Sequence, residues 1–190
     1  MLFKKNNNRW KTKHDIELIF NKIKPYLKHG TIILTSNFQN YSAILSPTPI
    51  KHSSFCYIEN GSYYSIELSH NCNLEKQPML DFLKDRNCIF LFDYFDPVIM
   101  EHSMNYIMDY KDIPYGFFGR REYCYQLIFN VYRDVYEKEF NKKFKRMSNF
   151  FPVISFFGLE FVNAHSIMKS KKFVPTCCII NNTFLTFKQE

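Results

Sequence analysis

Hydrophobic positions recur every three or four residues in three stretches of this chain, which predicts three amphipathic helices. The first runs from about His14 to Pro25, whose ring cannot continue a helix. The second covers Asp96–Asp109, and the longest covers Glu122–Phe140. A shorter helical stretch is expected near Met79–Lys84.

Between these helices, apolar and β-branched runs predict β-strands. The Asn60–Gly61 pair separates two of the runs and is a strong signal for a tight hairpin turn. Near the C-terminus, 150–157 is expected as a loop or short helix and 176–187 as terminal strands. The strands expected before that point are Thr31–Thr35, Lys51–Glu59, Ser62–Leu68 and Cys88–Phe92.

The order of these elements favours one domain. We find no internal repeat and no linker in 190 residues, a length that suits a single core. We therefore expect residues 14–190 to form one α+β domain with a small antiparallel sheet packed against helices. Residues 1–13 are polar and basic and are expected to form a flexible arm.

The net charge of +7 favours anionic partners. The arm carries one basic cluster, and Lys142, Lys143, Lys145 and Arg146 form a second. Solvated surface is the commoner fate of such runs, and an anionic membrane surface is the alternative. Aromatic residues make up 18% of the chain, and we expect them in the core rather than stacked on bases, so nucleic acid is not the expected partner. The sequence does not indicate an oligomeric state.

The six cysteines contain no Cys-x-x-Cys pair. The sequence shows no apolar leader and no apolar run long enough to span a bilayer. We therefore expect a cytoplasmic protein with free thiols. If the chain is viral, the expected compartment is the host cytoplasm. No spacing typical of zinc ligands is present, and neither a metal nor a cofactor is expected.

Candidate chemistry centres on Cys124, where a glycine-containing loop enters the longest predicted helix. A helix N-terminus stabilises a thiolate, which is the reactive form of cysteine. An imidazole within reach is also needed, and His52 begins a predicted strand. Counting outward from the hairpin turn makes His52 and Glu67 diagonal neighbours, so Glu67 is placed to orient the imidazole. A packed small hydrophobe remains the commoner role for a single cysteine at a helix start.

The segment Ile113–Tyr132 (IPYGFFGRREYCYQLIFNVY) resembles the catalytic cysteine segment of circularly permuted papain-fold hydrolases of the NlpC type. That group includes bacterial permuted amidase-like enzymes and a poxvirus member. Upstream, Gly30–Leu34 is similar to the family's opening strand, although Thr31 stands where the family usually has Asp. Lys51–Ile58 is similar to its histidine strand and Tyr64–Leu68 to its acid-bearing strand.

The resemblance implies a permuted papain-like fold in which Cys124 is the nucleophile, His52 the base and Glu67 the orienting acid. It places Tyr115 and Tyr123 at the substrate or oxyanion site. The implied reaction is hydrolysis or transfer of an acyl group through a thioester, on an amide, a peptide or a lipid ester. The alternative is a catalytically silent module of the same fold that binds nucleic acid or an anionic membrane through its basic clusters.

Overall fold

A seven-stranded antiparallel sheet forms the centre of the protein, in the order β4-β3-β2-β1-β5-β8-β9. The computed structural model describes residues 11–36, 50, 52–69, 72–86, 88–116, 123–143, 146–156, 159–180 and 183–187. The strands of this sheet are β1 (Ile32–Ser36), β2 (His52–Glu59), β3 (Ser62–Ser69), β4 (Cys72–Pro78), β5 (Cys88–Tyr94), β8 (Phe173–Ile180) and β9 (Thr183–Thr186). A separate two-stranded hairpin pairs β6 (Ile154–Phe156) with β7 (Leu159–Phe161).

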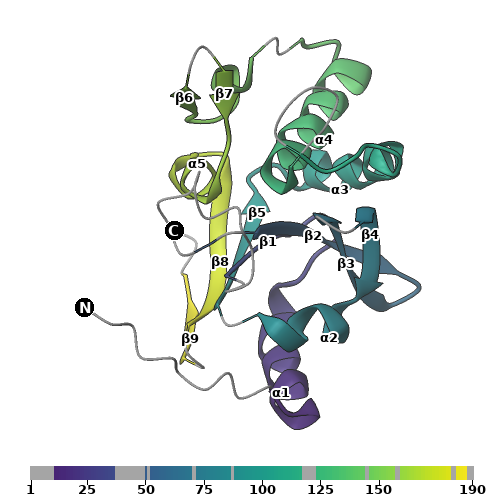
Figure 1. The fold of residues 1–190 in the computed structure, drawn as a ribbon, viewed down its shortest axis with the longest axis vertical. Helices are drawn as coiled ribbons and strands as arrows, with labels where there is room; N and C mark the ends of the chain where they lie inside the picture. Colours follow the sequence, from purple (N-terminus) through teal and green to yellow (C-terminus); the bar gives the residue numbers. More distant parts are fainter. Residues whose placement is uncertain are drawn as a thin grey trace.

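Helices cover both faces of the sheet. Figure 1 shows α1 and α2 on one side and α3 and α4 on the other. The larger hydrophobic core lies under α3 and α4 and the smaller one under α1 and α2. The helices are α1 (Lys13–Ile23), α2 (Met79–Phe82), α3 (Pro97–Tyr106), α4 (Cys124–Glu139) and α5 (Ala164–Lys169). The α+β class predicted from the sequence is confirmed.

Strand β1 is central because both of its faces are buried. Ile32 and Leu34 belong to the larger core, whereas Ile33 belongs to the smaller one. Gly30 precedes the strand with a φ of 92°, and a Cβ atom there would lie 2.6 Å from the backbone oxygen of Met100. Glycine therefore allows α3 to pack closely on the entry to β1.

The β2–β3 hairpin forms as predicted. Asn60 and Gly61 both have positive φ values, 50° and 74°, which is the conformation of a two-residue turn that matches strand twist. Glu59 pairs with Ser62, so the register counted from the sequence is confirmed.

Other elements differ from the sequence-based expectation. The edge strand β4 was not predicted, because an edge strand needs no buried face and this one is largely polar. Strand β6 lies within 150–157, which was expected as a loop or short helix, and neither its partner β7 nor α5 was anticipated.

The N-terminal segment expected as an arm lies outside the described residues up to residue 10. Its last residues belong to the start of the fold. Thr12 caps α1 by accepting from the backbone N–H of Asp15, and the Asp15 side chain returns the bond in a capping box. Within the described residues, no helix is long and apolar enough to cross a membrane.

Candidate active site

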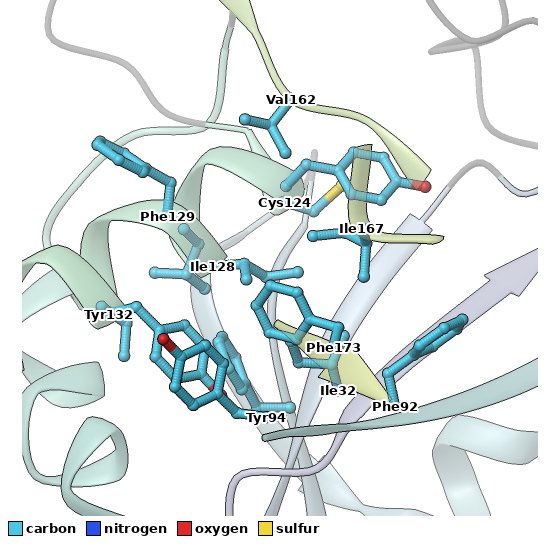
Figure 2. Close-up of a cluster of buried hydrophobic side chains, with 14 of the residues drawn as sticks. Ile32, Phe92, Tyr94, Cys124, Ile128, Phe129, Tyr132, Val162, Ile167 and Phe173 are labelled. Carbon is cyan, nitrogen blue, oxygen red and sulfur yellow. The ribbon is translucent and has the colours of Figure 1, made fainter. Parts of the chain in front are cut away.

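Cys124 is the first residue of α4. Tyr123 precedes it as the N-cap with an extended backbone, and no side chain caps the helix there. The first N–H groups of a helix have no partner within the helix and carry partial positive charge. The thiol therefore lies where a thiolate is stabilised. Figure 2 shows Cys124 at this end of α4 with Val162 and Ile167, which belong to the same hydrophobic cluster.

His52 and Glu67 form a short contact on the neighbouring strands. The Nε2 atom of His52 is 2.6 Å from the Oε2 atom of Glu67. The β2–β3 register places Ser54 opposite Glu67, two residues along from His52. Both side chains are buried, at 5% and 3% exposure of the residue. The structure thus brings together the two residues that the sequence made diagonal neighbours.

The His52 imidazole also contacts the thiol. A hydrogen bond and opposite charges couple Cys124 and His52, and both act on the pKa values of the two groups. Burial alone would lower the pKa of His52, but the charges of Glu67 and of the Cys124 thiolate outweigh it and raise that pKa to about 9.

The thiol responds in the opposite direction. Burial alone would raise the pKa of Cys124, but the adjacent imidazolium of His52 lowers it below its ordinary value. The backbone N–H of Ser53 also stabilises the thiolate. The arrangement therefore favours a thiolate–imidazolium pair.

Two residues that sequence reasoning missed hold Glu67. The Nη2 atom of Arg86 lies 3.3 and 3.4 Å from its two carboxylate oxygens, and Gln77 donates to Oε1 at 3.2 Å. Burial alone would raise the pKa of Glu67, but His52 and then Arg86 and Gln77 keep it below its usual range. Glu67 is therefore an ionised carboxylate with both oxygens occupied.

Two tyrosines lie within electrostatic range of the Cys124 thiol. Tyr115 is half-buried and Tyr125 is buried, and burial together with the nearby Cys124 charge raises the pKa of both phenols. The Tyr125 hydroxyl donates to the backbone oxygen of Ile50 at 3.3 Å. Tyr115 is thus a neutral hydroxyl beside the thiol.

Tyr123 is directed elsewhere. Its hydroxyl oxygen accepts a hydrogen bond from the backbone N–H of Val162 at 2.8 Å, and the residue is 4% exposed. The Tyr123 side chain therefore connects the entry of α4 to the segment that precedes α5.

Two lysines of the second basic cluster lie away from this site. Lys142 and Lys143 are exposed just beyond the C-terminal end of α4, whereas Cys124 begins the helix. A helix of 16 residues is about 24 Å long. Lys145 and the first-cluster residues Lys4, Lys5 and Arg9 lie outside the described residues, whereas Lys11 and Lys13 of that cluster are described.

A family model for permuted papain-like amidase enzymes, the YaeF/YiiX, C92 family, matches residues 26–173. The crystal structure of yiiX from Escherichia coli O157:H7 resembles the chain with a TM-score of 0.57 and 11% identity, covering 79% of this chain and 96% of that one. Among curated proteins, none matches significantly.

That yiiX structure is described as a metalloprotein. In the described part of the present chain, no group of three or more His, Cys, Asp or Glu side chains is arranged to hold a metal ion. We therefore derive no step through a metal.

The family match spans most of the chain, and the solved structure shows the same fold. The permuted papain-like fold implied by the resemblance of the Cys124 segment is confirmed. The chain belongs to the family of permuted papain-like amidase enzymes.

Proposed function

We propose that this protein is a cysteine-dependent hydrolase or acyltransferase with Cys124 as nucleophile, His52 as base and Glu67 as orienting acid. One observation carries the proposal. A buried imidazole contacts a carboxylate 2.6 Å away and also forms a hydrogen bond with a thiol at a helix N-terminus. Nucleophile, base and orienting group in that order constitute a nucleophilic triad.

The reaction would proceed in two steps. The Cys124 thiolate attacks the carbonyl carbon of the substrate, and the His52 imidazolium gives its proton to the leaving group as the bond to that group breaks. A thioester remains on the sulfur. His52, now neutral, takes a proton from water or from another acyl acceptor. The deprotonated water or acceptor attacks the thioester carbonyl, and the Cys124 thiolate leaves. Glu67 keeps the imidazole in place through both steps.

The oxyanion formed in each step needs donors. The backbone N–H of Cys124 at the free end of α4 is one, and we assign the Tyr115 hydroxyl, a neutral donor beside the sulfur, as the second. We assign Tyr123 a supporting role at the substrate site, because its hydroxyl already binds Val162. The family match supports an amide as the bond cleaved.

Selective alkylation tests the nucleophile. Cys88 is the matched internal control, because it is half-buried and burial raises its pKa to about 11. With iodoacetamide at pH 6, followed by peptide mass mapping, we expect Cys124 to react on the order of 100-fold faster than Cys88. Equal labelling of the two thiols would rule out an activated Cys124.

Turnover is tested separately. A p-nitrophenyl ester added to the protein and quenched in acid should leave an acyl group on the Cys124 peptide, and C124S should leave none there. The catalytically silent module predicts no acyl adduct in either protein. Titration with anionic vesicles then tests binding by that module, since Lys142 and Lys143 lie beyond the C-terminal end of α4, away from Cys124.

A further inference from the structure

We infer that Arg86 is a positioning residue that holds Glu67 against His52 and sets the charge that the imidazole experiences. This inference rests on the function proposed above, because it concerns the same triad.

Arg86 contacts both oxygens of the carboxylate, and His52 contacts one of them. Its Nη2 atom lies 3.3 and 3.4 Å from the two oxygens of Glu67, while the Nε2 atom of His52 lies 2.6 Å from Oε2. The arginine is 6% exposed, so solvent screens this interaction little. A cation and an imidazole therefore hold Glu67 between them.

The guanidinium is itself fixed. Its Cζ atom lies 4.6 Å above the centre of the Phe82 ring, and its Nε atom is 3.5 Å from Asp85. Cation–π and ion-pair contacts of this kind restrict a long side chain to one orientation. Glu67 thus meets a preorganised donor.

The backbone around Arg86 is held by the N-terminal segment. Lys11 donates through Nζ to the carbonyl oxygen of Leu83 at 3.2 Å and also to that of Arg86. These carbonyls lie in and just after the 3-10 helix Leu83–Asp85, and that of Leu83 also accepts from the backbone N–H of Arg86. The segment before α1 therefore supports the turn that carries Arg86.

Charges alternate along the row that results: Arg86 positive, Glu67 negative, His52 positive and Cys124 negative. Several other groups face this row. Neutral Gln77 and Glu75 lie on β4, where Glu75 is opposite Glu67. Asp85 and Lys11 lie near Arg86, and the tyrosines near the thiol are Tyr115, Tyr123 and Tyr125. Among these groups, Arg86 is the cation in contact with Glu67.

Removing the Arg86 charge should raise the pKa values of His52 and Cys124, because each then loses its proton without a nearby positive charge. In R86Q we expect the pH midpoint of Cys124 alkylation and the midpoint of the His52 ring, followed by NMR of carbon-labelled histidine, both to rise by about one pH unit. R86K keeps the charge but lacks the planar fork, so its midpoints should rise by only a few tenths of a unit.

R133Q is the matched control. Arg133 pairs with Asp134 on α4, so its loss should leave both midpoints unchanged. If R86Q does not fold, the smaller rise in R86K tests the inference alone. A merely structural arginine would lower the unfolding temperature while leaving the midpoints in place, and unchanged or lowered midpoints would overturn the inference.

The outcomes also separate this inference from the proposed function. If Cys124 of the unmodified protein alkylates with the midpoint of an ordinary thiol, the proposed function fails. If that midpoint is low but Arg86 variants do not move it, only the role of Arg86 fails.

Discussion

Replacing Glu67 with glutamine tests the electrostatic basis of the site most directly. The change keeps the side-chain shape and a hydrogen-bond acceptor but removes the charge. The His52 pKa is raised from 6.5 to about 9, a difference worth about 3 kcal/mol. Burial, which lowers the His52 pKa, is the largest single influence on it, and the neighbouring groups together outweigh it. Without the Glu67 charge, we therefore expect the His52 pKa to return to its ordinary value or below.

The thiol should follow the imidazole. Without an imidazolium partner, the Cys124 pKa should return to about 8.5 or higher, so that at pH 6 less than roughly 1% of the thiol is ionised. We expect the rate of iodoacetamide alkylation of Cys124 at pH 6 to fall by about 100-fold in E67Q. The rate is measured by peptide mapping, well below the unfolding temperature of each variant.

Glu75→Gln supplies the control. Glu75 lies directly opposite Glu67 on β4 and is only half-buried, so its replacement changes the local charge without touching His52. E75Q should alkylate like the unmodified protein. A rate in E67Q that stays within threefold of the unmodified protein at pH 6 would refute the thiolate–imidazolium pair.

Three further predictions concern stability. Gly61→Ala should destabilise the hairpin by about 1 kcal/mol in urea unfolding, because the space around it is open and only the positive φ is strained. Phe55→Ala should cost about 3–5 kcal/mol by the same measurement, since the ring is fully buried; a loss below 1 kcal/mol would contradict this core packing. Tyr123→Phe should cost about 1–2 kcal/mol by leaving the Val162 N–H without its acceptor, while Cys124 alkylation continues at its usual rate; a strong loss of alkylation would instead give Tyr123 a direct role.

The sequence predicted those parts of the site that depend on local patterns. The Asn60–Gly61 turn determines strand register by itself, and register alone places Glu67 near His52. The apolar stripe of α4 predicted a helix start within two residues of Cys124. Both signals depend only on residues close together in the sequence, so they can be recognised without knowledge of the fold.

Arg86 and Gln77 were not predictable in the same way. Each is a single polar residue without a motif, and each reaches Glu67 only because β4 and the turn after α2 pack beside β3. The edge strand β4 lacks the apolar alternation that identifies a strand. Contacts made by long polar side chains across tertiary structure leave no periodic trace in a sequence.

The burial of Cys124 and His52, which are 3% and 5% exposed, has a kinetic consequence. A reagent too large for the small exposed area reaches the sulfur only when the protein opens around it, so its observed rate is an opening equilibrium multiplied by a chemical rate constant. Alkylating reagents of increasing size would measure how far that opening extends. An acyl group on the sulfur would be shielded from water between openings, so the molecule that enters first decides between hydrolysis and transfer.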